Sequence, residues 1–203
     1  MSPDKSYPNR TIETLLDTDY VTAATKAALE PRLATGVPAP AYFSADSFHL
    51  LTILCQRLLA LEDGVLAARI AAGIDERLAA DKSNGWRYRQ MPGDRIAYDL
   101  ALYALDETAK DTYQNRFADL PEAQQLLLML QLQKGEVSGD WKQVSPKLFW
   151  EELLCEATEI FYSYPYAQNE IGFVGMADGH GWKQIGISGQ EDPEPQTHTH
   201  LHP

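Results

Sequence analysis

Apolar residues recur every three to four positions through most of the chain, and this spacing constrains the fold more than any other feature. In the clearest case Leu66, Ile70, Ile74 and Leu78 are four residues apart. A period of 3.6 places such residues on one face of an α-helix. Five other segments show the same period, and none alternates apolar and polar residues convincingly as a strand would. The sequence therefore predicts an all-α fold, a compact bundle of about six helices.

Capping and helix-breaking residues predict where several of these helices begin and end. Ser44 and Ser145 are typical N-caps, since a serine hydroxyl can accept from an otherwise unsatisfied backbone N–H. We expect Pro31 and Pro165 to end the first and last helices, because proline lacks the N–H that continues a helix. Gly135 is expected to stop the helix that precedes it.

The chain of 203 residues suits one domain, or one domain with a trailing arm. We expect a flexible N-terminal arm at 1–10, a helical domain at 11–165, an irregular partner-binding arm at 166–189 and a disordered tail at 190–203. The tail is mostly proline, glutamate, threonine and histidine, a composition with too few apolar residues to form a core. A short hairpin within 171–187 is an alternative for part of the arm.

Charge and hydropathy exclude several classes of function. The net charge of -12 argues against nucleic acid as a partner, because phosphate binding needs clustered lysine and arginine. It argues equally against an anionic membrane surface. No run of about 18 uncharged apolar residues occurs, so no membrane-spanning helix is expected. The first ten residues lack the apolar core of a signal peptide, which predicts a cytoplasmic location for the chain as it stands.

No pattern in the chain predicts a complete catalytic or cofactor site. Three glycines, Gly172, Gly175 and Gly179, follow a helix and precede none, the wrong context for a dinucleotide-binding turn. There is no nucleophile elbow, phosphate-binding loop or paired metal-binding Glu-x-x-His motif. We therefore assign no catalytic residue, no cofactor and no metal to this chain.

Several titratable residues have more than one interpretation. His49 is expected at the core or its boundary, and His180 is either a turn or interface residue or a general base. Asp75 and Glu76 are expected on faces of their helix other than the apolar stripe. On the last helix, an acidic side that faces either solvent or a partner is expected from Glu151, Glu152, Glu156 and Glu159. Cys55 and Cys155 lie among apolar neighbours and are expected to be buried, although a disulfide between them stays open.

An aromatic and glycine-rich segment follows the last helix and is the candidate partner-binding site. Tyrosine and tryptophan offer large, rigid contact areas with a polar tip, and glycine permits close approach of the backbone. The alternative is that these rings fold back and seal the core of the bundle. The candidate partner-binding residues are Tyr162, Tyr164, Pro165, Tyr166, Asn169, Phe173, His180, Gly181, Trp182 and Gly186.

Two stretches resemble the gluconate 2-dehydrogenase subunit 3 family. The first is Phe117-x-x-Leu120 followed by Gln124-Gln125 and Leu127-Leu128. The second is Phe161-Tyr-Ser-Tyr-Pro165 followed by Asn169, Gly181-Trp182 and Ile185-Gly186. The resemblance covers about 45–187. Two departures are Ala167-Gln168, where the family often has two glycines, and the lack of the twin-arginine export signal that many members carry.

The resemblance implies a non-catalytic small subunit. Such subunits accompany a large FAD-dependent sugar or polyol dehydrogenase of the glucose-methanol-choline type, so FAD is expected in the partner and none in this chain. A cytochrome c subunit is a further candidate partner, and a periplasmic location is the alternative for members with the export signal. Two other functions stay open: a stand-alone enzyme with a site near His180, Trp182, Arg87 and Arg89, and a transient folding chaperone.

Overall fold

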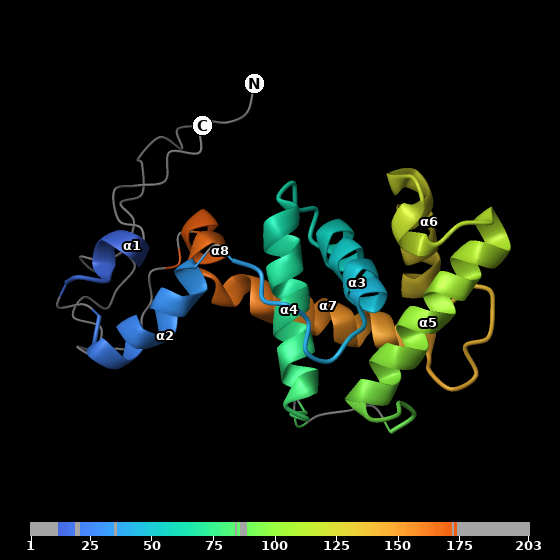
Figure 1. Cartoon of the computed structure of the whole chain (residues 1–203), viewed down its shortest axis with the longest axis horizontal. Helices are drawn as coiled ribbons and strands as arrows, with labels where there is room; N and C mark the ends of the chain where they lie inside the picture. The colour runs from blue at the N-terminus through green and yellow to red at the C-terminus, as the bar shows by residue number, and fades with distance from the viewer. Residues whose placement is uncertain are drawn as a thin grey trace, which may run out of the picture. The chain divides into compact units, whose positions relative to one another are not determined.

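The computed structural model describes residues 12–18, 21–34, 36–83, 85, 89–171 and 173. These residues form helices and no strand, which confirms the predicted all-α class, and six of the helices run for more than ten residues (Figure 1). The elements are α1 Ile12–Leu15, α2 Ala23–Leu33, α3 Ala45–Leu58, α4 Gly64–Ala79, α5 Asp94–Tyr113, the 3-10 helix η1 Phe117–Asp119, α6 Glu122–Lys134, α7 Pro146–Ser163 and α8 Pro165–Glu170.

The chain divides into two compact units. Unit 1 comprises Met1–Ala34 and Phe161–Pro203, and unit 2 comprises Thr35–Ile160. Unit 1 therefore combines α1, α2 and α8 with the last residues of α7, and unit 2 contains α3 to α6 with the rest of α7. The expected N-terminal arm at 1–10 and C-terminal tail at 190–203 lie outside the described residues.

The core of unit 2 is built from the helical stripes that the sequence predicts. All four residues of the Leu66 to Leu78 stripe of α4 are buried, with exposed fractions of 8% or less. Helix α4 packs closely on α3, in which Leu54 and Cys55 are completely buried. On α5 four of the nine buried residues are alanine, and these small side chains lie near the fully buried Tyr98 on the helix and allow close packing of neighbouring helices.

The predicted helix boundaries at Ser44, Gly135 and Pro165 are confirmed, whereas Pro31 behaves differently from expectation. Ser44 Oγ accepts from Ser47 N at 3.1 Å, and Gly135 ends α6 with φ of +72°. Pro31 lies inside α2, which continues to Leu33, because a proline in the last turn removes only one of the helix's hydrogen bonds. Pro165 follows the end of α7 and opens α8, since its fixed φ also suits the first turn of a helix.

Unit 1 brings the two ends of the described chain together. A small apolar cluster of Ile12, Leu16 and Leu29 joins α1 to α2. Asn169 of α8 then binds α1 with both halves of its amide. Its Oδ1 accepts from Ile12 N at 2.9 Å, and its Nδ2 donates to Glu13 Oε2 at 2.8 Å.

Across the described ranges, every helix falls short of the length or the apolar character that crossing a bilayer requires.

Candidate partner-binding surface

Three large aromatic side chains are exposed at the C-terminal end of the described residues of unit 1. Tyr162 is 44% exposed, Tyr166 56% and Phe173 50%. Ile171, between the last two, is 58% exposed. The part of the aromatic segment that the structure describes therefore presents rings to solvent, and we call these four residues the aromatic surface.

Local structure explains which side chains of this segment point inward. Pro165 and Ala167 are buried, so the start of α8 covers unit 1 with its small residues. Tyr166 is on the other side of the helix, where its hydroxyl donates to Glu170 Oε1 one turn later at 2.9 Å. Tyr162 packs its ring edge-on against Phe161 with centroids 5.0 Å apart. The small residues at the start of α8 therefore cover unit 1, while the rings of Tyr162 and Tyr166 stay exposed, and binding of a partner by these rings stays a prediction.

The other predicted binding residues fall into two groups. Tyr164 is half-buried, and Asn169 is half-buried with its amide bound to α1, so Asn169 positions α8 within unit 1. His180, Gly181, Trp182 and Gly186 lie outside the described residues. Arg87 lies outside them too, so the arrangement expected for a stand-alone active site near His180 stays a prediction.

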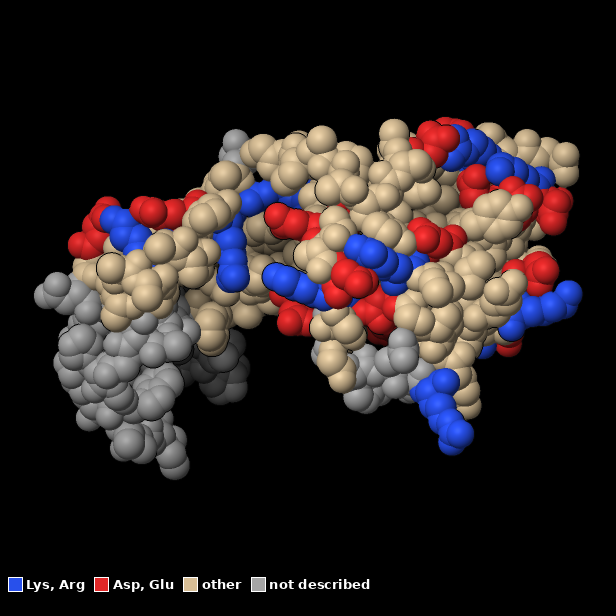
Figure 2. All heavy atoms as spheres, turned by 60° about the horizontal axis from the view of Figure 1, so that its bottom comes forward, with Lys and Arg blue, Asp and Glu red and all other residues tan. Residues whose placement is uncertain are grey.

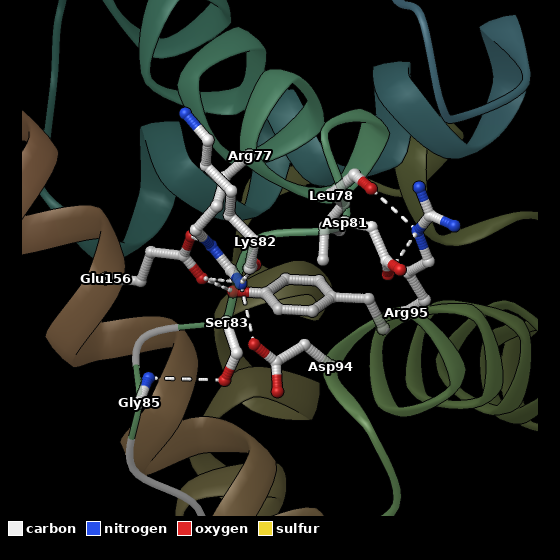
Figure 3. Close-up of polar contacts among 10 residues, drawn as sticks. Arg77, Leu78, Asp81, Lys82, Ser83, Gly85, Asp94, Arg95 and Glu156 are labelled. Carbon is white, nitrogen blue, oxygen red and sulfur yellow. Dashed lines mark hydrogen bonds and ion pairs between the residues drawn. The ribbon is translucent and has the colours of Figure 1, made fainter.

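A buried polar cluster in unit 2 is the main feature that the sequence did not predict (Figure 3). Arg77 of α4 forms a two-pronged pair with Glu156 of α7: Nε donates to Oε1, and Nη2 donates to Oε2 at 2.8 Å. Nη1 donates to Asp94 Oδ2 at 2.6 Å and to the carbonyl of Lys82 at 2.7 Å. Tyr98 completes this Arg77 cluster by donating its hydroxyl to Glu156 Oε2 at 2.6 Å.

The Arg77 cluster corrects the expectation that Glu156 lies on an outward acidic face. Its side chain is 3% exposed, and those of Arg77 and Asp94 are 14% and 9% exposed. Asp75 of α4 is also buried. Its carboxylate accepts hydrogen bonds from the backbone N–H groups of 41–43. Buried charges persist only where partners satisfy them.

Electrostatics in the cluster favour a structural role. Burial raises the pKa of Tyr98 well above its usual value, and the charge and hydrogen bond of Glu156 raise it further. Burial lowers the pKa of Arg77, but the hydrogen bond and charge of Glu156 outweigh it and the net pKa is raised. In the part of the chain that the structure describes, no buried side-chain nitrogen or oxygen lacks a hydrogen-bond partner. The cluster therefore ties α4, α5 and α7 together.

An open hollow of about 320 Å³ lies beside this cluster, between the end of α4 and the start of α5. Arg95 lines it, but its guanidinium donates to the carbonyls of Leu78 at 2.7 Å and Ala79 at 2.9 Å, and it lies 5.3 Å from the ring centre of Tyr42. Figure 2 shows basic and acidic side chains intermixed on the face in view, with no extended patch of one sign. No group of histidine, cysteine and carboxylate side chains suited to a metal ion occurs among the described residues.

The two cysteines differ from expectation in one respect. Cys55 is fully buried, where burial and then the charge of Glu156 raise the pKa of its thiol. Cys155 is exposed, because it lies on the outward side of α7 while Leu153 and Ala157 face the core. Both thiols are free, so no disulfide joins α3 to α7.

The described residues define a small all-helical protein with exposed aromatic side chains in unit 1 and a buried, fully paired polar cluster in unit 2. Residues 45–189 match the family model described as gluconate 2-dehydrogenase subunit 3, well over half of the chain. The chain belongs to that family, which confirms the resemblance found in the sequence. The family takes its name from a subunit of a dehydrogenase complex. No curated protein and no solved structure matches the chain.

Proposed function

We propose that this protein is a non-catalytic small subunit that binds and stabilises a large FAD-dependent sugar or polyol oxidoreductase. Family membership supports the assembly with a dehydrogenase. The observation that carries the binding role is the aromatic surface, where three rings are about half exposed although each would gain from burial. Tyrosine and phenylalanine are common anchors of protein interfaces.

Stabilisation follows from binding. A subunit that binds only the folded form of its partner shifts the partner's folding equilibrium by mass action. In this proposal the FAD and the chemistry belong to the partner, and the small subunit contributes contact area. The isolated chain is then expected to be colourless and to show no sugar dehydrogenase turnover.

Coexpression of the chain with the dehydrogenase subunit of the same cells tests the proposal. The expected result is a stable complex on size exclusion, with the flavin in the large subunit and a higher thermal midpoint for that subunit in the complex. Tyr166→Ala combined with Phe173→Ala should raise the Kd at least about tenfold. Tyr103→Ala is the matched control, because Tyr103 is 66% exposed on α5 and lies outside the aromatic surface.

Three outcomes would contradict the proposal. Tight FAD binding or dehydrogenase turnover by the isolated chain would indicate an enzyme. A mature dehydrogenase that elutes without this chain, after needing it to fold, would indicate a transient chaperone. An unchanged Kd for the double variant would show that the aromatic surface is not the contact.

A further inference from the structure

The helix α6 carries leucine on both of its faces. Its inward face buries Leu128, Met129 and Leu132. On the outward face Leu126 is 44% exposed, Leu127 47% and Leu130 44%. A helix that is apolar all round is typically covered on all sides, and the described residues cover only one side of this helix.

The rotation of α6 is fixed by a buried glutamine, so the outward leucines cannot turn inward without breaking polar contacts. Gln125 is 2% exposed and accepts from Arg57 Nε at 2.8 Å. Its Nε2 lies 3.2 Å from the carbonyls of both Phe117 and Ala118. These contacts join α6 to α3 and to η1, and the face of α6 opposite Gln125 carries the exposed leucines.

The outward face has the spacing of a helix that docks into a groove. Ala123, Leu126, Leu127 and Leu130 occupy positions i, i+3, i+4 and i+7, the pattern by which an amphipathic helix inserts its apolar side into a partner. Ala123 is exposed like the three leucines. No charged residue lies between Glu122 and Lys134, so docking this stretch would not remove a charge from water.

Size and charge decide which occupant fits this face. A helix of 13 residues is about 20 Å long, and one face of it offers much less than the roughly 800 Å² per partner of a stable dimer. Two copies would also bring together two chains that each carry a net charge of -12. A groove in a larger protein can enclose the helix on three sides and bury more of it.

We propose that the outward face of α6 docks into an apolar groove of the large dehydrogenase subunit, as a contact separate from the aromatic surface. This inference rests on the proposed function for the identity of the partner. It assigns a contact to unit 2, whereas the aromatic surface belongs to unit 1, so each unit would hold the partner through its own element.

The test is the Kd of the purified chain for the purified large subunit. Leu127→Glu combined with Leu130→Glu should raise the Kd at least about tenfold, because a carboxylate in an apolar groove loses its hydration. Val65→Glu is the matched control, since Val65 is an apolar residue of α4 that is 49% exposed. Circular dichroism and thermal melting show whether each variant keeps its fold, and glutamine replaces glutamate at both positions if it does not.

The outcomes separate this inference from the proposed function. Failure of the unmodified chain to bind the large subunit would reject both. Binding that is lost in Tyr166→Ala with Phe173→Ala but unchanged in the α6 variant would overturn the α6 contact alone. A dimer of the isolated chain that the α6 variant dissolves would also overturn it, by identifying a second copy as the occupant.

Discussion

Arg77 and Glu156 are 79 positions apart in the sequence and joined by two hydrogen bonds in unit 2. Their geometry is bidentate, the arrangement in which a guanidinium and a carboxylate interact most strongly. Because Asp94 and Tyr98 complete the cluster, three helices depend on one arginine. Stability should therefore be unusually sensitive to this residue.

Arg77→Met should lower the free energy of unfolding by about 3–5 kcal/mol, because it leaves the buried Glu156 carboxylate without its counter-charge. Urea unfolding followed by circular dichroism measures the change. Lys142→Met is the control, since the pair that Lys142 forms with Asp140 is exposed and its loss should cost no more than about 1 kcal/mol. Equal costs for the two variants would show that the Arg77 cluster is not a structural tie.

Tyr98 should make the protein sensitive to alkaline pH. Its pKa is raised in the folded state, so its contribution to stability is complete below pH 10 and is lost as pH rises through the folded pKa. The thermal midpoint should fall above about pH 10, and Tyr98→Phe should flatten that fall. The variant should also cost about 1.5–3 kcal/mol at neutral pH, because a hydrogen bond to a charged acceptor is lost. Burial and a hydrogen bond to Asp99 raise the pKa of Tyr42 to about 12. The Tyr98→Phe variant should therefore still show a smaller fall in its thermal midpoint at alkaline pH, because Tyr42 also loses its proton there.

Asp75→Asn should loosen the segment that leads into α3. Asp75 Oδ2 accepts from Ala41 N at 2.6 Å and Oδ1 from Phe43 N at 2.8 Å, so an amide must turn its own N–H toward one of these donors. We expect a loss of about 2–3 kcal/mol and faster hydrogen exchange at the amides of 41–43. Glu76→Gln changes an exposed carboxylate on the same helix and should leave both measurements unchanged. Protected amides in the Asp75 variant would contradict the assignment.

The two thiols should react at very different rates. Cys155 is exposed and should be modified by a thiol reagent at once in the folded protein. Cys55 is completely buried with a raised thiol pKa, so it should react only as fast as the protein unfolds. Stopped-flow absorbance with the Cys155→Ala variant isolates the slow phase. If both thiols of the unmodified protein reacted with the reagent in one fast phase, Cys55 would not be buried and α3 would not be packed as described.

The sequence was sufficient for the helices because their signals are local. The period of the α4 stripe lies within a single helix and the cap at Ser44 within a single turn, and both are confirmed. Proline is locally ambiguous, since Pro165 can either end a helix or open one. The structure shows that it opens α8.

The buried charges were not predicted because their partners are distant in the sequence. The charge of Glu156 by itself predicts an outward position, and that prediction is wrong. Glu156 lies seven residues after Phe149 and three after Leu153, a spacing that puts it on the same buried face of α7 as these two residues. The arginine that pairs with Glu156 is determined by how α4 packs against α7. The spacing of apolar residues within one helix does not predict that packing. The exposure of the aromatic rings also depends on packing within unit 1.

Asn169 is synthesised 157 residues after Ile12, the α1 residue from whose backbone N–H it accepts a hydrogen bond. On the ribosome, all of unit 2 therefore emerges between the two halves of unit 1. Helix α1 can form its hydrogen bonds with Asn169 only after α8 has been synthesised, whereas the helices of unit 2 are free to fold earlier. Fusions or truncations at either end consequently act on the same small unit, and a shortened N-terminus should disturb the docking of α8 as directly as a change in α8 itself.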